Sequence, residues 1–169
     1  MKPAHAPYAH GAIRLRLLAE GDLRETLAWR NRDGVRQQFK NPAPLEWEAH
    51  HGWFSRYCEK PDDLVLIAER GDNGAKVGQV AIYAIDPENQ TAEIGRFVVA
   101  PEFQGQGLMR AAIDVLMRFA ADRLSLRLVY LEVIETNARA RRLYESLGFE
   151  VTQSEVGLMR MERSLNDYL

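Results

Sequence analysis

Apolar positions recur along the chain with two different periods, and these periods predict an alternation of strands and helices. Ile13, Leu15 and Leu17 alternate with arginines, as in a half-buried strand. From Asp22 onward the apolar residues are spaced as on a helix, and a second helical stretch covers residues 45–60. The N-terminal part therefore predicts a strand followed by two helices.

The middle of the chain changes to β-prone runs. Residues 64–69 and 77–85 are apolar, and the segment 71–74 between them is a strong turn signal, so the two runs predict a hairpin. Residues 91–100 predict a further strand, which the turn-forming segment 86–89 joins to the hairpin. Three neighbouring strands are therefore expected here.

The last part of the chain predicts two more helices and three more strands. One helix follows residues 105–107, because the next apolar positions lie on a single helical stripe formed by Leu108, Ala112, Val115, Leu116 and Phe119. Residues 128–133 predict a strand. Thr136 is the expected N-cap of a short helix that extends through Leu147, and residues 149–161 leave room for two final strands.

The composition is typical of a globular protein with one hydrophobic core. The chain has 169 residues, of which 46% are hydrophobic and 27% charged, which suits one ordinary domain better than two. We expect a single domain over residues 1–169, with residues 1–11 as a loose N-terminal segment. The net charge is −2 without a block of like charges, which argues against a nucleic acid or an anionic membrane as partner.

Cysteine usage and the longest apolar runs bear on location and metal binding. Cys58 is the single cysteine, so an internal disulfide and a multi-thiolate metal site are excluded. No apolar run approaches the roughly 20 residues that span a bilayer, and the first residues do not resemble a secretory signal. A cytoplasmic protein is expected. The histidines lack a metal-ligand spacing, so no metal is expected.

A glycine-rich loop joins the strand at residues 93–99 to the following helix. The loop reads Gln104-Gly105-Gln106-Gly107. At such a point, backbone N–H groups and the positive end of the helix dipole converge, and glycine lets the backbone come close to an anion. The pattern predicts a phosphate-binding site, with an ordinary glycine turn before a helix as the alternative interpretation.

A second motif follows the next predicted strand. Residues 137–149 read Asn-Ala-Arg-Ala-Arg-Arg-Leu-Tyr-Glu-Ser-Leu-Gly-Phe. Together with the glycine loop they resemble the GNAT superfamily of acetyltransferases, whose signatures are Gln/Arg-x-x-Gly-x-Gly/Ala and Asn-x-x-Ala-x-x-Leu-Tyr-x-x-x-Gly-Phe. The matching positions are Gln104, Gly107, Asn137, Ala140, Leu143, Tyr144, Gly148 and Phe149. Met109 departs from the pattern, because the family usually has Gly or Ala there.

The resemblance implies a fold and a co-substrate. The fold is α+β, with a mostly antiparallel mixed sheet of about six or seven strands, splayed at the fourth and fifth strands and flanked by about four helices. The co-substrate is acetyl-CoA, and the acceptor is a primary amine on a small molecule. The residues implied in cofactor binding are Phe97, Val98, Val99, Gln104, Gly105, Gln106, Gly107, Leu108, Met109, Arg110, Asn137, Ala140 and Tyr144. Among them, the resemblance implies that residues 97–99 lie along the pantetheine arm, that Asn137 bonds the pantetheine amide and that Arg110 reaches a phosphate.

Glu93 and Tyr144 are the catalytic residues that the resemblance implies. The attacking amine must be neutral, and Glu93 lies at the spacing before Gln104 that the glutamate base has in several family members. Tyr144 occupies the family's position for the hydroxyl that protonates the leaving thiolate. The alternatives are a solvated charge at a strand end for Glu93 and a core aromatic for Tyr144.

The acceptor is expected beside the segment that precedes the hairpin. This segment resembles a GNAT branch that acetylates nucleotide-linked amino sugars, and the residues implied in acceptor binding are Trp29, Arg30, Asn31, Arg36 and His50. Arginines and a tryptophan suit a sugar nucleotide through phosphate contacts and ring stacking. The alternatives are a structural role for these residues, acetylation of protein N-termini as in a related branch, and a non-catalytic acetyl-CoA-binding module. Whether the chain forms a homodimer stays open.

Overall fold

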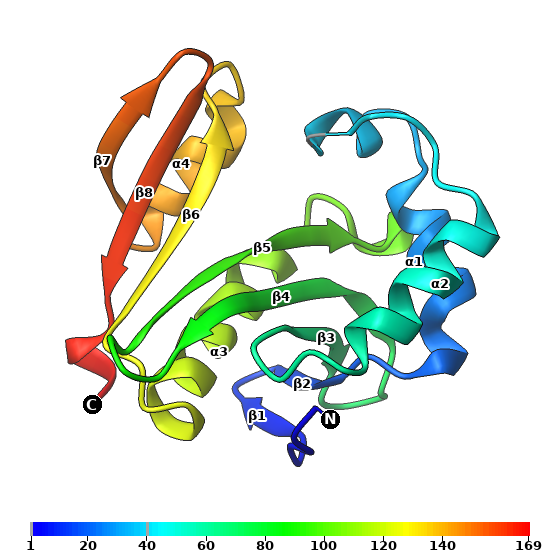
Figure 1. The fold of residues 1–169 in the computed structure, drawn as a ribbon, viewed down its shortest axis with the longest axis horizontal. Helices are drawn as coiled ribbons and strands as arrows, with labels where there is room; N and C mark the ends of the chain where they lie inside the picture. Colours follow the sequence, from blue (N-terminus) through cyan, green and yellow to red (C-terminus); the bar gives the residue numbers. More distant parts are fainter. Residues whose placement is uncertain (1, 40) are drawn as a thin grey trace.

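Residues 2–39 and 41–169, which the computed structural model describes, form one eight-stranded mixed sheet (Figure 1). The strand order is β1-β2-β3-β4-β5-β6-β8-β7, and neighbours are antiparallel except for the parallel pair β5 and β6. The bounds are Tyr8–His10 (β1), Ile13–Leu17 (β2), Leu64–Arg70 (β3), Lys76–Asp86 (β4), Thr91–Val99 (β5), Leu128–Ile134 (β6), Glu150–Glu155 (β7) and Leu158–Ser164 (β8). The predicted α+β class is confirmed.

Helices cover both faces of this sheet. Within the described residues the α-helices are Leu23–Arg30 (α1), Trp47–Tyr57 (α2), Leu108–Arg123 (α3) and Ala138–Ser146 (α4). Two separate hydrophobic clusters show that α1 and α2 pack on one face and that α3 and α4 pack on the other. The predicted helices are confirmed. The expected cap of α4 is wrong by one residue, because the side chain of Asn137, not Thr136, accepts the hydrogen bond of the cap.

The N-terminal segment departs from the prediction. Residues 1–11 are predicted to be loose, but Tyr8–His10 form β1 and pair antiparallel with β2. The ring of Tyr8 contacts Phe119 of α3 edge-on, at a centroid distance of 5.8 Å. A strand of this length is too short to give a periodic signal in the sequence. It raises the strand number above the six or seven expected.

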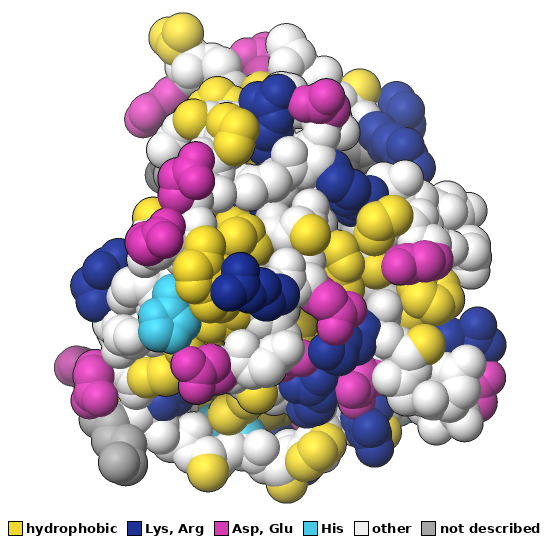
Figure 2. Space-filling model, turned by 90° about the vertical axis from the view of Figure 1, so that its right-hand side faces the viewer, with side chains coloured by type: hydrophobic (Ala, Val, Ile, Leu, Met, Phe, Trp, Pro, Cys, Tyr) yellow, Lys and Arg dark blue, Asp and Glu magenta, His cyan; other side chains and the backbone are white. Residues whose placement is uncertain are grey.

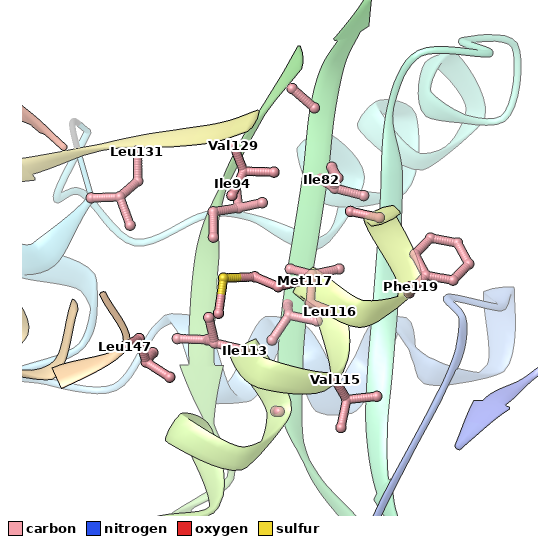
Figure 3. Packing of buried hydrophobic residues seen from close by; sticks show 14 of the residues in the cluster. Ile82, Ile94, Ile113, Val115, Leu116, Met117, Phe119, Val129, Leu131 and Leu147 are labelled. Atoms are coloured by element: carbon pink, nitrogen blue, oxygen red, sulfur yellow. The ribbon is translucent and has the colours of Figure 1, made fainter. Parts of the chain in front are cut away.

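The apolar side chains of α3 form the core on one face of the sheet (Figure 3). Residues on its inner stripe are fully buried against β4, β5 and β6: Ile113, Leu116 and Phe119 from the helix, and Ile82, Ile94 and Val129 from the strands. Complete burial of such a side chain stabilises a fold by about 1.5–3 kcal/mol. The packing fixes the start of α3 beside the end of β5, where the glycine loop lies.

A buried ion-pair network joins the start of α1 to the sheet. Asp22 is 3% exposed, and its carboxylate accepts hydrogen bonds from both terminal nitrogens of Arg16 at 2.8 and 2.9 Å. The Lys76 ammonium lies 2.9 Å from the same carboxylate, and Arg16 also pairs with Glu69 at 2.9 Å. Burial alone would raise the pKa of Asp22, but the hydrogen bonds from Arg16, Lys76 and the Ala19 N–H outweigh it and hold this pKa below its ordinary value. The network anchors α1 to β2 and β4.

The parallel strands β5 and β6 pair over a short distance and then separate (Figure 1). The paired positions are Thr91 with Leu128, Ala92 with Val129 and Glu93 with Tyr130. The predicted splay is confirmed. The two strands are fifth and sixth along the chain, rather than fourth and fifth, because β1 precedes the strands that the sequence predicts.

The surface around α1 and α2 carries charges of both signs. Figure 2 shows Lys and Arg side chains interspersed with Asp and Glu on this side of the molecule. A nucleic-acid interface would instead require basic groups gathered along one surface. Among the described residues, no helix combines the length and the apolar character that a bilayer span requires.

Candidate active site

The gap between β5 and β6 holds a cavity of about 470 Å³. Its lining comes from β4, β5, β6, β8, from α4 and its cap, and from the end of α1 with the segment that follows it. The predicted site residues that it brings together are Arg30, Glu93, Phe97, Asn137, Ala140 and Tyr144. A second cavity of about 270 Å³ adjoins it, and both are lined by Glu93, Glu132 and Leu158. The two cavities are therefore direct neighbours.

Glu93 lies at the last position where β5 still pairs with β6. Its half-buried side chain faces β4, where the hydroxyl of Tyr83 donates a hydrogen bond to Glu93 Oε2 at 3.3 Å. A carboxylate at the point where two strands diverge lies at the entrance of the gap between them. This agrees with the position that the sequence predicts for a base.

Tyr144 reaches the cavity from α4. Its ring contacts Phe97 of β5 at a centroid distance of 5.9 Å and Phe149 at 6.1 Å. Burial raises the pKa of the Tyr144 hydroxyl to about 12. The phenol therefore keeps its proton at neutral pH and is available as a proton donor.

A bulge bends β5 beside the cavity. Arg96 has a φ of +54°, in the left-handed region, and the pairing of β4 with β5 shifts register opposite it. Gln79 donates a side-chain hydrogen bond to the Arg96 carbonyl at 3.0 Å, and Asp63 binds the Arg96 guanidinium at 2.8 Å. Left-handed backbone at a non-glycine residue costs about 1–3 kcal/mol, so these contacts hold a strained conformation. A bulge changes the direction in which neighbouring side chains point, and the side chains beside this bulge line the cavity.

The three β5 residues predicted to face the pantetheine arm differ in their surroundings. Phe97 lines the cavity. The side chain of Val98 is buried in the cluster under α1 and α2, and the Val99 carbonyl accepts a hydrogen bond from Arg32. Only Phe97 therefore presents its side chain to the cavity.

The start of α3 fits the pyrophosphate of acetyl-CoA. Gly105 and Gly107 have φ values of +75° and +72°, a region that favours glycine. Gly107 is the N-cap and has no side chain to accept the N–H groups of the first turn. The loop that also contains Gln104 and Gln106 is exposed. Uncapped N–H groups at the positive end of a sixteen-residue helix form an anion-binding site.

The first turn of α3 explains how Met109 is tolerated. Leu108 and Met109 are half-buried and pack against the main core, so neither crowds the loop. Arg110 is exposed and donates hydrogen bonds to the side-chain and backbone oxygens of Ser146 at 3.3 and 3.1 Å. Arg110 thus ties α3 to the end of α4. Its predicted phosphate contact would require it to leave Ser146.

Asn137 links α4 to the segment after α1. Its side-chain oxygen accepts the Ala140 N–H at 3.2 Å, and its amide nitrogen donates to Gln38 at 2.6 Å. Both residues line the cavity, so this bond crosses its edge. The predicted bond from Asn137 to the pantetheine amide would require Gln38 to move.

The residues predicted to bind the acceptor mostly lie outside the cavity lining. Trp29 is 5% exposed in the core under α1 and α2. Asn31 binds the backbone of Leu45 twice at 2.9 Å, and the Arg36 side chain binds Asp33 at 2.7 Å. These contacts are structural, because they hold the α1–α2 connection in shape.

His50 also has a structural environment. It is buried on α2, stacks on Trp53 and lies 3.4 Å from the Thr26 hydroxyl. Burial lowers the pKa of His50, and the neighbouring positive charge of Arg30 lowers it further. Of the five predicted acceptor residues, Arg30 alone lines the cavity. The other four do not line the cavity. Sequence alone does not distinguish a core aromatic residue, or a residue that fixes a loop, from a residue that contacts a ligand.

Comparison with known proteins identifies the family. The profile of the acetyltransferase (GNAT) family matches residues 26–149, which include both signature motifs and the strands around the gap. The chain belongs to the GNAT acetyltransferase family. It is therefore an acyltransferase that uses acetyl-CoA as co-substrate for N-acetylation.

Several GNAT proteins are similar over most of the chain. Spermidine N(1)-acetyltransferase of Escherichia coli is 30% identical over 146 residues, covering 86% of this chain and 76% of its own. An uncharacterised protein of Methanocaldococcus jannaschii, MJ1062, is 26% identical over 142 residues, but the chain spans only 28% of its length. The crystal structure of spermidine N-acetyltransferase from Vibrio cholerae, in complex with CoA and spermine, has a TM-score of 0.85 at 24% identity, with 93% of this chain and 98% of that chain covered. This last likeness supports the GNAT fold.

Sequence reasoning missed two residues of the cavity lining, Tyr83 of β4 and Gly95 of β5, and it missed Gln79, which holds the bulge. All three lie within the predicted strands, where no motif singled them out. Gly95 alone carried a signal, because glycine inside a strand indicates a bulge or a close approach. The bulge is found at the next residue, Arg96.

Proposed function

We propose that this GNAT enzyme acetylates a primary amine of a small cationic compound of the polyamine type. The observation that carries the proposal is the acidic lining of the two neighbouring cavities. They contain the carboxylates Glu93, Glu132 and Glu155. The similarity to spermidine acetyltransferases agrees with this acceptor class.

Two of the three arginines that line these cavities form ion pairs with acidic residues outside the lining. Arg96 pairs with Asp63 at 2.8 Å, and Arg160 pairs with Glu162 at 2.9 Å. Acidic side chains in and directly beside the lining therefore outnumber the basic ones. A negative potential in a cleft attracts a cationic acceptor and raises its local concentration. Such a field suits an alkyl polyamine better than a sugar nucleotide, whose diphosphate is negative.

In the proposed reaction Glu93 and Tyr144 have separate roles. Glu93 accepts a proton from the acceptor ammonium, so that the neutral nitrogen attacks the thioester carbonyl carbon. Acetyl-CoA supplies the activated acetyl group. After the attack the nitrogen loses its second proton to solvent and the carbon–sulfur bond breaks. Tyr144 donates its proton to the leaving thiolate and regains one from solvent. Backbone N–H groups of β5 near the bulge are the proposed donors to the carbonyl oxygen, on which negative charge develops.

The acceptor class is tested by following free thiol with a panel of amines. The panel contains spermidine, a nucleotide-linked amino sugar and a peptide with a free N-terminus, and acetyl-CoA alone serves as the control. Acceptor-dependent thiol release is expected with spermidine. Release with the sugar nucleotide or the peptide and none with any polyamine would overturn the proposed acceptor. Cofactor binding without release in any arm would favour a non-catalytic module.

Acetyl-CoA is expected to stabilise the chain against heat, because it binds the folded state selectively. At a ligand concentration one hundred times Kd the gain is about 2.7 kcal/mol, which corresponds to a rise in Tm of roughly 5–10 °C. A thermal melt with and without acetyl-CoA measures it. ATP, which lacks the pantetheine arm, should shift Tm less at equal concentration. An unchanged melt with acetyl-CoA would contradict the assignment of the glycine loop and the gap.

Arg30 favours a second candidate, an amine that also carries an anionic group. Its Nη1 is buried and has no hydrogen-bond partner among the described residues, and its guanidinium lies 4.4 Å from the Phe39 ring centroid. Burial lowers the pKa of Arg30. A buried guanidinium nitrogen without an acceptor is costly, and a carboxylate or phosphate on the acceptor would satisfy it.

Arg30→Ala is expected to separate the two candidates through the acceptor KM. For a polyamine, loss of the opposing positive charge should leave KM unchanged or lower it. For an acceptor with an anionic group, KM should rise on the order of tenfold or more, since a charge-assisted hydrogen bond contributes about 1.5–3 kcal/mol. Steady-state kinetics with each acceptor distinguishes them. Arg36→Ala, outside the cavity lining, is the control. Loss of acetyl-CoA affinity in Arg30→Ala would instead show that Arg30 supports the fold of the cofactor site.

A further inference from the structure

Tyr83 and Glu93 face each other across β4 and β5. They are directly paired in the register of the two strands, and the Tyr83 hydroxyl donates to Glu93 Oε2 at 3.3 Å. Both side chains line the main cavity. A directly opposed cross-strand pair places its side chains on the same face of the sheet, here the face under α1 and α2.

The ring of Tyr83 is held from its other side. The Arg96 guanidinium lies 4.1 Å from the ring centroid, and Asp63, 5% exposed, fixes that guanidinium at 2.8 Å. Burial raises the pKa of Tyr83, and the nearby charge of Glu93 raises it further. The phenol therefore keeps its proton and can act only as a donor toward the carboxylate at neutral pH.

Gly95 provides the space for the Tyr83 hydroxyl. A Cβ atom at Gly95 would lie 2.4 Å from Tyr83 Oη, closer than such atoms approach, and 3.4 and 3.6 Å from two ring carbons. Gly95 does not have a left-handed backbone, and it follows Glu93 by two positions, on the same face of β5. The contact with the hydroxyl thus accounts for a glycine inside this strand.

We propose that Tyr83 is a positioning residue that holds the Glu93 carboxylate toward the acceptor amine, and that Gly95 is required because it leaves room for the Tyr83 hydroxyl. This inference rests on the proposed function, in which Glu93 takes the amine proton. In the free enzyme a carboxylate on a flexible side chain samples several rotamers, and a fixed donor reduces them to the one that faces the cavity.

The test is a double-mutant cycle with Tyr83→Phe and Gly95→Ala, followed by acceptor-dependent thiol release. Tyr83→Phe keeps the ring over Arg96 and removes the donor, and Gly95→Ala displaces the hydroxyl from Glu93. Each is expected to lower kcat about 10- to 100-fold, with the KM values for acetyl-CoA and acceptor nearly unchanged. The double variant should be no slower than either single variant, because both remove the same hydrogen bond.

Two further variants make the outcome decisive. Gly21→Ala, which meets no atom within 4 Å, is the glycine control and should retain full activity. Glu93→Gln is measured alone and combined with Tyr83→Phe, and the combination should match Glu93→Gln alone. A direct catalytic role for Tyr83 predicts an additional loss in the combination and would overturn the inference.

The same set separates failure of this inference from failure of the proposed function. If Glu93→Gln lowers kcat and Tyr83→Phe does not, Glu93 remains the base and Tyr83 does not position it. If Glu93→Gln retains full activity at every pH, Glu93 is not the base, and this inference falls together with the proposed role of Glu93, whereas the acceptor class is decided by the amine panel. If Gly95→Ala lowers the melting temperature equally strongly with and without the Tyr83→Phe substitution, the glycine serves the fold and not the hydroxyl.

Discussion

Tyr144→Phe is expected to lower kcat on the order of 10² to 10⁴, the usual contribution of a general acid. The substitution removes the phenol proton and keeps the ring that packs between Phe97 and Phe149. Burial raises the pKa of this hydroxyl to about 12, so the hydroxyl keeps its proton throughout the physiological pH range. The KM for acetyl-CoA and the melting temperature should change little, because the apolar contacts remain.

Tyr168→Phe is the matched control for this prediction. The Tyr168 hydroxyl donates a hydrogen bond to Asp114 of α3 at 2.6 Å, and Tyr168 lines neither cavity. Its loss should cost about 1 kcal/mol of stability and leave kcat unchanged. A decrease of less than roughly threefold in Tyr144→Phe would exclude Tyr144 as the proton donor. Water would then be the better candidate for that role.

Asp22→Ala is expected to lower the free energy of unfolding by about 3–5 kcal/mol at neutral pH. The substitution leaves the positive charges of Arg16 and Lys76 next to each other without the buried carboxylate that both contact. Urea denaturation measures the loss. Asp72→Ala is the control, because Asp72 pairs with Arg70 at 2.9 Å on the exposed surface, where such a pair contributes about 0–1 kcal/mol.

The contribution of Asp22 should depend on pH in a defined direction. Its pKa is lowered in the folded state, so the folded protein favours the charged form. The stabilisation is complete above the unfolded pKa, about 3.9, and is lost as the pH falls toward the folded value. The difference in stability between the native protein and Asp22→Asn should therefore shrink below about pH 4. A difference that stays constant from pH 7 to pH 3 would show that the Asp22 charge is not what stabilises the network.

The parts of the fold that sequence predicted are those that local patterns determine. The stripe of α3 from Leu108 to Phe119 and the glycine turn before it are both short-range signals. β1 was missed because three residues are too few for a periodic pattern, and because Tyr8 packs against Phe119, which is distant in the sequence. The bulge at Arg96 likewise depends on Gln79 and Asp63, on other parts of the chain. No local pattern encodes such contacts.

The candidate site likewise contains some residues that sequence motifs predicted and others that they did not. Motifs predicted the positions of Glu93 and Tyr144 in the cavity, because each residue has a fixed place relative to a glycine turn or helix start. Acceptor residues were predicted from the resemblance of the segment around Trp29 and His50 to a GNAT branch, but both side chains are buried, Trp29 on α1 and His50 on α2. Aromatic and polar residues occur in cores as well as in binding sites, so residue type without geometry does not separate the two.

In its backbone hydrogen bonds the sheet consists of two plates joined by the short pairing between β5 and β6, and one hydrophobic core packs across both. One plate contains β1 to β5, and the other contains β6, β8 and β7, with three paired positions between them. A small rotation about this hinge would alter few backbone hydrogen bonds. It would nevertheless change the separation between Glu93, on the hinge, and Tyr144, which α4 carries beside the second plate. The position at which β5 and β6 stop pairing therefore affects the distance between the proposed base and the proposed acid.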